Sequence, residues 1–185
     1  MYRVTLDAGH GGYDSGAVYG GVKEKDLTMQ IVRKLYPRLV QRGIATAVTR
    51  MGDYAPGNFE YDLDRELRER VRLSDAYVSD LFVSVHINAG GGTGSEVLIS
   101  GIGGNAERGA KLIKGNLSLA GCWPDRGIKV QNVLVLRETD CPAYMTENGF
   151  IDNENDFRKL TNPFIIESIA IAHYCGICEF FGLTY

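Results

Sequence analysis

The sequence predicts a single α/β domain with a twisted, mostly parallel sheet of about six strands and helices on both faces. Strand-like apolar runs alternate with helical patterns along the whole chain. Residues 81–87 are nearly all apolar, as in a strand that is buried on both faces. The chain has 185 residues and no repeat, low-complexity segment or linker, so we expect one domain over residues 1–185.

The sequence pattern in the first half of the chain predicts a strand, a loop, a helix, a second strand and a second loop, in that order. Residues 2–7 form the first expected strand. Residues 8–23 contain six glycines and no periodic pattern, which predicts a long loop of the kind that usually carries function. A helix is expected from Glu24, because apolar residues then recur at every fourth position up to an Arg42-Gly43 stop. Residues 44–50 predict a second strand and residues 51–60 a loop.

The second half continues the alternation. The patterns predict helices over residues 62–79, 105–120, 153–160 and 163–181, and strands over residues 81–87, 95–100, 133–137 and 143–148. Pro163 suits the first turn of the last helix. In such sheets, binding sites form where loops leave the carboxyl ends of strands.

Composition excludes several classes of protein. The net charge is −3, so no overall basic field would attract nucleic acid or an anionic surface. No apolar run approaches the roughly 20 residues that cross a bilayer, so we expect no membrane span. The chain enters its first strand directly, without a signal-peptide pattern.

Four cysteines are too few for a disulfide scaffold in a chain of this length. Cys175-Gly-Ile-Cys178 has the spacing of a redox pair or of half a zinc site. However, it lies inside an apolar helical run, and no second such pair exists. We therefore interpret Cys175 and Cys178 as buried free thiols in the last helix.

Two of the three histidines lie at the ends of β-like runs: His10 where the chain leaves the first strand, and His86 after the apolar residues 81–85. Each alone could be an ordinary hydrogen-bonded histidine. Glu24, at the start of a helix, could likewise be an acid that favours the helix dipole. Together, however, two imidazoles and one carboxylate make the ligand set of hydrolytic zinc sites, which keep a fourth position for water. The spacing leaves both interpretations open.

Glu147 lies at the end of the strand expected over residues 143–148, where a buried carboxylate costs free energy unless it is paired or hydrogen-bonded. It either pairs with a residue such as Arg137 or acts as a general base. His173 lies in the middle of the last helix, and we interpret it as a packed or surface histidine.

Other catalytic motifs are absent from the sequence. There is no G-x-S-x-G elbow, and no cysteine is arranged with a histidine as a nucleophile. The glycine-rich loop lacks the G-x-x-x-x-G-K-[ST] pattern of a phosphate-binding loop, and it is not a dinucleotide fingerprint.

Four ordered motifs resemble one known family. They are Asp7-Ala-Gly-His10-Gly-Gly-Tyr-Asp-Ser-Gly-Ala17, Glu24-Lys-Asp, Ser84-Val-His86-Ile-Asn-Ala and Glu147-Asn-Gly-Phe-Ile-Asp-Asn. The family is that of the zinc-dependent N-acetylmuramoyl-L-alanine amidases of the amidase-3 type, and the resemblance runs from Val4 to about Leu160. Arg70 and Glu96 also match positions that the family usually fills in this way.

The resemblance implies that His10, Glu24 and His86 bind one zinc ion and that Glu147 is the catalytic acid/base. Two departures from the family pattern, Ser15 after Asp14 and Asn148 after Glu147, remove no group that the chemistry needs. Regulated members carry a helix over the metal in a long insertion. Residues 88–95 and 100–105 are too short for such a helix, so we expect an open site.

The implied activity is hydrolysis of the amide bond between N-acetylmuramic acid and the L-alanine of the stem peptide, which lyses the wall. Two alternatives stay open: a zinc peptidase that cuts within the stem peptide, and an inactive wall-binding module. A glycosidase would require paired carboxylates instead of histidines.

The resemblance also predicts the setting. We expect the catalytic domain of a phage or prophage endolysin or of an autolysin, with peptidoglycan as its partner and a separate wall-binding domain in the whole protein. Its place of action would be the bacterial cell wall. It would be reached by phage-type release from the host cytoplasm or through a signal that has been removed.

Overall fold

The computed structural model describes residues 1–59 and 61–185. Its core is a six-stranded sheet with the strand order β4-β1-β5-β8-β6-β7. The strands are β1 (Arg3–Ala8), β4 (Ala45–Val48), β5 (Leu81–Asn88), β6 (Ser95–Ile99), β7 (Asp125–Val130) and β8 (Ala143–Phe150). All neighbours pair in parallel except β6 and β8, which are antiparallel. The predicted fold class is confirmed.

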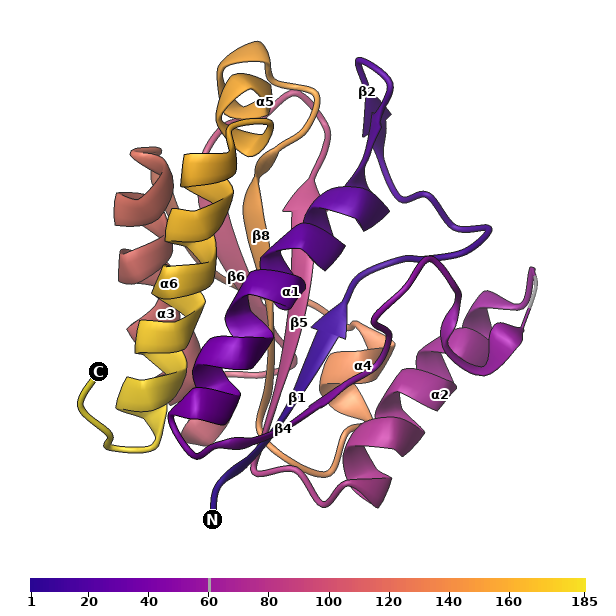
Figure 1. Ribbon diagram of the computed structural model, residues 1–185, viewed down its shortest axis with the longest axis vertical. Helices are drawn as coiled ribbons and strands as arrows, with labels where there is room; N and C mark the ends of the chain where they lie inside the picture. Colours follow the sequence, from indigo (N-terminus) through magenta and orange to yellow (C-terminus); the bar gives the residue numbers. More distant parts are fainter. Residues whose placement is uncertain (60) are drawn as a thin grey trace.

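Helices cover both faces of the sheet (Figure 1). The larger core lies under α1 (Glu24–Gln41), α3 (Gly104–Gly121) and α6 (Pro163–Phe180). The smaller core lies on the other face, under α2 (Leu63–Ala76) and α4 (Leu134–Arg137). Short elements complete the chain: the β2 (Val18–Tyr19) and β3 (Val22–Lys23) hairpin, η1 (Pro56–Asn58) and α5 (Glu154–Leu160).

Two predicted elements need correction. Residues 133–137 were expected as a strand, but Leu134–Arg137 form the one-turn helix α4, which buries Val135 and Leu136 in the smaller core. A run this short has no period that separates strand from helix. The sixth strand is instead β7, which the sequence analysis missed because its residues are mostly polar or exposed. As an edge strand, β7 pairs only with β6, so it needs no apolar face of its own.

By length and composition, α6 could cross a membrane. In the structure it packs against α1 and α3, and residues such as Ile166, Ile169 and Ile177 lie in the larger core. This helix therefore serves as a core helix of the domain.

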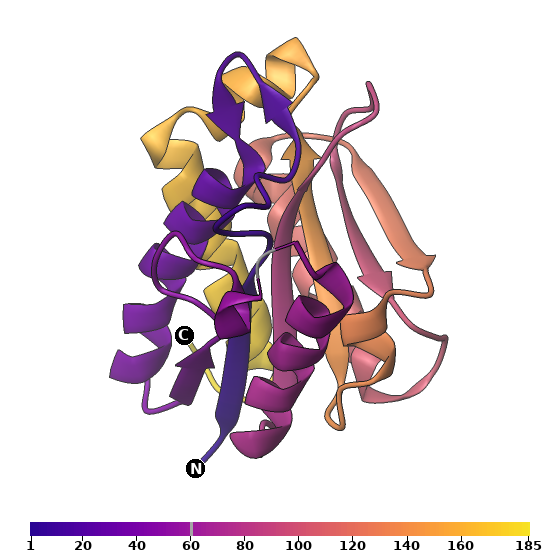
Figure 2. The same cartoon turned by 90° about the vertical axis from the view of Figure 1, so that its right-hand side faces the viewer.

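The topology brings several strand ends to one edge of the sheet. β1, β5 and β8 run in the same direction, toward the top of Figure 1 and Figure 2, so their carboxyl ends lie at the same edge of the sheet. β6 runs in the opposite direction and begins at that edge. The connection between β5 and β6, residues 89–94, contains no helix.

Candidate metal centre

His10, Glu24 and His86 meet at this edge of the sheet. Nε2 of His10 lies 3.0 Å from Oε2 of Glu24, and Nδ1 of His86 lies 3.0 Å from Oε1 of the same carboxylate. The two imidazole rings are 4.8 Å apart and nearly perpendicular. One carboxylate therefore links two histidines that come from different strand ends.

His10 occupies a left-handed backbone conformation, with a φ of 61°. Two contacts hold it there. Nη2 of Arg70 donates a hydrogen bond of 2.9 Å to the His10 carbonyl oxygen, and the Asp14 carboxylate lies 2.7 Å from Nδ1 of the His10 ring. A carboxylate on one imidazole nitrogen orients the ring and leaves the other nitrogen for a metal.

Glu24 is buried at the first position of α1, where a helix favours negative charge. The backbone N–H groups of Ala17 and Ile87 each donate a hydrogen bond of 3.0 Å to its carboxylate. Gly9 packs so closely on the His86 ring that a Cβ there would lie 2.4 Å from ring atoms. The glycine therefore sets the distance between the loop and the second histidine.

The charges of this cluster are strongly coupled. Burial alone would raise the pKa of Glu24, but hydrogen bonds from His10 and His86 hold it well below its usual range. Burial alone would lower the pKa of His10, but Glu24 and Asp14 raise it to about 9. Without a metal ion, the positive charge of protonated His10 thus balances the negative charge of the Glu24 carboxylate.

A buried ion network supports the cluster from below. The guanidinium of Arg70 binds the carboxylates of both Asp7 and Glu66 at 2.5 Å, and all three side chains are at most 3% exposed. Although burial opposes it, Arg70 lowers the pKa of Asp7. On the other side of the loop, Arg50 donates hydrogen bonds to the Ala8 and Gly9 carbonyl oxygens. The backbone that carries His10 is therefore fixed from two sides.

Glu147 lies beside the cluster, because it is in register with His86 on the neighbouring strand. Its Oε2 is buried and has no hydrogen-bond partner among the described residues. Burial, together with the carboxylates of Glu24 and Glu96, raises the pKa of Glu147 to about 8. Arg137 does not pair with it and instead contacts Asn132 and Glu138. A buried carboxyl group with a raised pKa and an oxygen that lacks a hydrogen-bond partner is typical of a residue that takes part in catalysis.

The donor set fits a metal ion. The ligand atoms of His10, Glu24 and His86 all lie within 4.8 Å of one another. In the part of the chain that the structure describes, this is the one group of its kind. Two imidazoles and one carboxylate leave an open position on a tetrahedral ion, as in catalytic sites.

Comparison with known proteins agrees with this geometry. The family model for N-acetylmuramoyl-L-alanine amidases matches residues 4–179. The chain is a member of this family. The predictions of a peptidoglycan amidase family and of an amide-cleaving enzyme are thereby confirmed.

Individual relatives show the same relationship. The amidase is 36% identical to N-acetylmuramoyl-L-alanine amidase CwlM of Bacillus licheniformis, over all of this chain and 70% of the relative. It is 39% identical to the endolysin of Bacillus phage SPP1, over 97% of this chain and 66% of the relative. Among solved structures, the catalytic domain of CwlV from Bacillus (Paenibacillus) polymyxa var. colistinus matches with a TM-score of 0.88 at 27% identity, over 100% of both chains.

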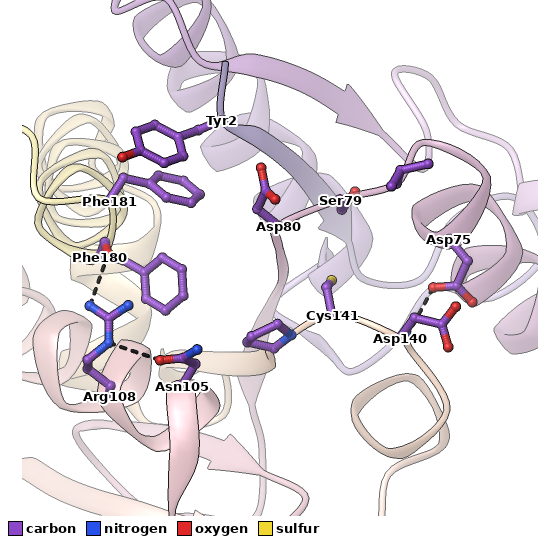
Figure 3. Close-up of a pocket in the computed structure, with 12 residues that line it drawn as sticks. Tyr2, Asp75, Ser79, Asp80, Asn105, Arg108, Asp140, Cys141, Phe180 and Phe181 are labelled. Carbon is purple, nitrogen blue, oxygen red and sulfur yellow. Dashed lines mark hydrogen bonds between the residues drawn. The ribbon is translucent and has the colours of Figure 1, made fainter.

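Two cavities flank different parts of the amidase. A pocket of about 220 Å³ adjoins His10 and His86, and apolar side chains of α2, β8 and the α4 region line it, among them Leu67, Val133 and Met145. A larger cavity of about 550 Å³ lies at the opposite end of the strands, between Tyr2, Cys141 and Phe181 (Figure 3). It contains none of the residues of the cluster.

The remaining sequence predictions can be placed as well. All four cysteines are free; Cys178 is buried and Cys175 half-buried in α6. His173 is fully buried and hydrogen-bonded, as a packed histidine would be. Asp14, which holds the His10 ring, was not among the predicted site residues. Its position four residues after His10 in the glycine-rich loop was the available signal.

Proposed function

We propose that this chain hydrolyses the amide bond between N-acetylmuramic acid and the L-alanine of the stem peptide, with one zinc ion bound by His10, Glu24 and His86. The main support is the proximity of a three-donor cluster to a buried carboxyl group, that of Glu147, with an unpartnered oxygen. Membership of the amidase family supports the choice of bond.

The donor types favour zinc among divalent ions. Imidazole nitrogen suits zinc, copper, iron and nickel, whereas sites for magnesium and calcium are made of oxygen ligands. When bound, zinc supplies a Lewis acid that polarises an amide carbonyl and makes a water molecule more acidic. Asp14 holds the His10 ring so that Nε2 is directed toward Glu24 and the ion position.

Glu147 is the proposed general base and acid. A cation held by the three ligands favours the ionised carboxylate, which opposes the burial that keeps this group protonated without an ion. The carboxylate accepts the proton of the attacking water at its unpartnered oxygen. It then donates that proton to the L-alanine nitrogen as the amide bond breaks.

Replacement of Glu147 by Gln tests this role. The variant keeps the shape of the side chain but cannot accept the proton, so we expect at least a hundredfold loss of peptidoglycan lysis with unchanged zinc content. The control is Glu154→Gln, since Glu154 is 70% exposed on α5. The proposed role of Glu147 would be wrong if the Gln variant kept its lytic activity.

Product analysis decides which bond is cut. The amidase reaction frees the amine of L-alanine, whereas a stem-peptide peptidase exposes a different terminus and a binding module releases nothing. Labelling of new amines in digested, purified peptidoglycan, followed by identification of the labelled residue, separates the three outcomes.

The proposed place of action is the bacterial cell wall, in an endolysin or an autolysin. We propose that residues 1–185 form the catalytic domain and that a separate wall-binding domain accompanies it in the whole protein. Support comes from the lengths of the relatives, of which the chain spans 70% and 66%.

A further inference from the structure

A row of charged side chains continues from the metal centre across the sheet. Glu147 on β8 is in register with Glu96 on β6, and residues directly opposite each other point to the same face. Arg126 on β7 follows, at the irregularity between Ser95 and Val97 where β7 carries an extra residue. The row therefore consists of His86, Glu147, Glu96 and Arg126, which lie on the neighbouring strands β5, β8, β6 and β7.

Glu96 is nearly buried and holds Arg126 in place. Nε of Arg126 donates a hydrogen bond of 2.7 Å to Oε2 of Glu96, and Nδ2 of Asn88 donates one of 3.0 Å to Oε1. The guanidinium also lies 4.9 Å from the centre of the Phe150 ring. These contacts fix the plane of the guanidinium.

The outer edge of this guanidinium is available to a ligand. The Arg126 side chain is 38% exposed, and neither of its Nη atoms has a hydrogen-bond partner among the described residues. A guanidinium edge with parallel N–H groups matches the two oxygens of a carboxylate. Other cations near the cluster are engaged: Arg70 is buried by Asp7 and Glu66, and Lys25 binds Asp53.

The spacing suits a substrate group close to the scissile bond. Arg126 lies two strands from Glu147, or roughly 10 Å at the usual strand separation. Two extended residues span about 7 Å, and a hydrogen bond adds about 3 Å. A carboxylate on the second residue of the stem peptide would thus reach Arg126 when the L-alanine nitrogen is at Glu147. On the opposite side of the cluster, the pocket beside α2 presents mainly apolar surface, and the one cation that lines it, Arg70, is engaged by Asp7 and Glu66.

We propose that Arg126, held by Glu96, determines specificity by binding the free α-carboxylate of the second stem-peptide residue, a γ-linked D-glutamyl residue. This inference rests on the proposed function, because it takes the L-alanine nitrogen as the leaving group. Amidation of that carboxylate removes its charge and one acceptor oxygen. The enzyme then prefers walls in which this position is not amidated.

The test compares two muropeptides that differ only at this group, one with D-isoglutamate and one with D-isoglutamine after L-alanine. We expect the zinc-loaded protein to favour the acid at least tenfold in kcat/KM, mainly through KM, as for a charge-assisted hydrogen-bonded pair. Arg126→Gln should bring that ratio close to one, mainly by raising KM for the acid. Arg126→Lys keeps the positive charge but lacks the two parallel N–H groups of the guanidinium, so it should give an intermediate ratio.

A matched control comes from the same strand. Lys129 is exposed on β7, so Lys129→Gln removes an equal charge and should keep the preference for the acid. If Arg126 merely stabilised the fold, Arg126→Gln would slow both substrates equally and leave their ratio as in the wild type. That result would overturn the proposal.

Binding of the product dipeptides, followed by NMR titration, separates this inference from the proposed function. The role of Arg126 is supported if L-alanyl-D-isoglutamate binds more tightly than its amide and if Arg126→Gln removes this difference. This holds even if the protein cleaves neither muropeptide, a result that would refute the proposed function but not the role of Arg126. Equal cleavage and equal binding of acid and amide refute the role of Arg126 and leave the amidase activity standing.

Discussion

The Glu24 carboxylate organises the centre before any ion arrives. Each of its oxygens faces one imidazole, and each also accepts a backbone N–H. This arrangement positions the ligands in advance, so little side-chain entropy is lost when an ion binds. It also stabilises a proton on His10, whose pKa is raised to about 9. An ion must displace that proton, because metals bind neutral imidazole.

Zinc binding should therefore release protons near neutral pH. In the metal-free protein His10 is protonated below about pH 9, so each pH unit between 6.5 and 8 should raise the zinc affinity about tenfold for this one proton. Calorimetric titration with zinc in buffers of different ionisation enthalpy measures the number of protons released.

Glu147→Gln is the appropriate background for this titration, because the Glu147 carboxyl, with a pKa of about 8, would add its own proton. Asp14→Asn should reduce proton release at pH 8, since Asp14 contributes to the high pKa of His10. An affinity that did not change with pH would contradict this picture.

Individual residues differed in how far the sequence could identify them. His10 and His86 lie at the ends of apolar runs, so their place near a strand end was predictable, whereas Glu147, also expected at a strand end, lies inside β8, which continues to Phe150. The partnership of Glu96 and Arg126 was not predictable, because it depends on the parallel register of β6 with β7 and on the irregularity in that pairing. Register across a sheet is set by tertiary packing, and single-sequence patterns do not contain it.

At the scale of elements, the glycine-rich loop between β1 and α1 is shaped by the cluster that it carries. A Cβ on Gly16 would lie 2.6 Å from both Oε2 of Glu24 and Cδ2 of His10. Gly21, in the same loop, has a similar positive φ of 79° but nothing within 4 Å of its Cβ position. Gly16 is therefore required both by its backbone conformation and by its close contact with the cluster, whereas Gly21 is required by its backbone conformation alone.

Gly16→Ala should weaken zinc binding, and Gly21→Ala should not. Both substitutions strain the backbone by roughly 1 kcal/mol, as expected for a non-glycine residue at positive φ. Only the former displaces two metal ligands, so we expect at least a tenfold loss of zinc affinity for Gly16→Ala alone, measured by competition with a chelator. Equal losses in the two variants would mean that backbone strain, and not ligand displacement, is responsible.

Long helices were predictable because their apolar residues repeat over several turns, as in α1 with Leu27, Ile31 and Leu35. α4 was predicted as a strand because four consecutive apolar residues fit either period. β7 escaped notice for the opposite reason: as an edge strand, it is held by backbone hydrogen bonds to β6 and has few apolar residues.

At the scale of the whole molecule, a buried polar chain connects the last helix to the metal centre. Nδ2 of Asn148 donates hydrogen bonds to the His86 carbonyl oxygen and to Oγ1 of Thr146. That hydroxyl lies 2.9 Å from Nε2 of His173, whose Nδ1 lies 2.9 Å from the Ile169 carbonyl oxygen. A carbonyl only accepts, so Nδ1 carries the proton and Nε2 accepts from Thr146. The neutral imidazole satisfies every partner.

The stability of the domain should therefore depend on pH through His173. Burial lowers the pKa of His173 to about 4, whereas the unfolded chain titrates near 6.5. Between these values the unfolded state binds the extra proton, so stability is fully present above pH 6.5 and is lost as the pH falls toward 4. The slope is about 1.4 kcal/mol per pH unit for one proton, or roughly 3 kcal/mol over the window. Glu147 acts in the same window with the opposite sign, because its pKa of about 8 lies above that of an unfolded glutamate, about 4.3. The Glu147→Gln background removes this contribution. The lowered pKa values of Asp7 and Glu24 act below about pH 5, and the raised pKa of His10 acts above pH 6.5.

Urea unfolding of the metal-free Glu147→Gln variant between pH 5 and 6.5 measures this slope. In this background His173→Gln removes the remaining group that titrates in the range, so the free energy of unfolding should become nearly independent of pH, whatever its absolute value. Thr146→Val, which keeps His173 buried but removes one partner, should lower stability by about 1 kcal/mol and keep the slope. If the Glu147→Gln/His173→Gln double variant unfolded with the pH dependence of Glu147→Gln alone, the acid sensitivity would arise elsewhere in the molecule, and His173 would serve packing alone.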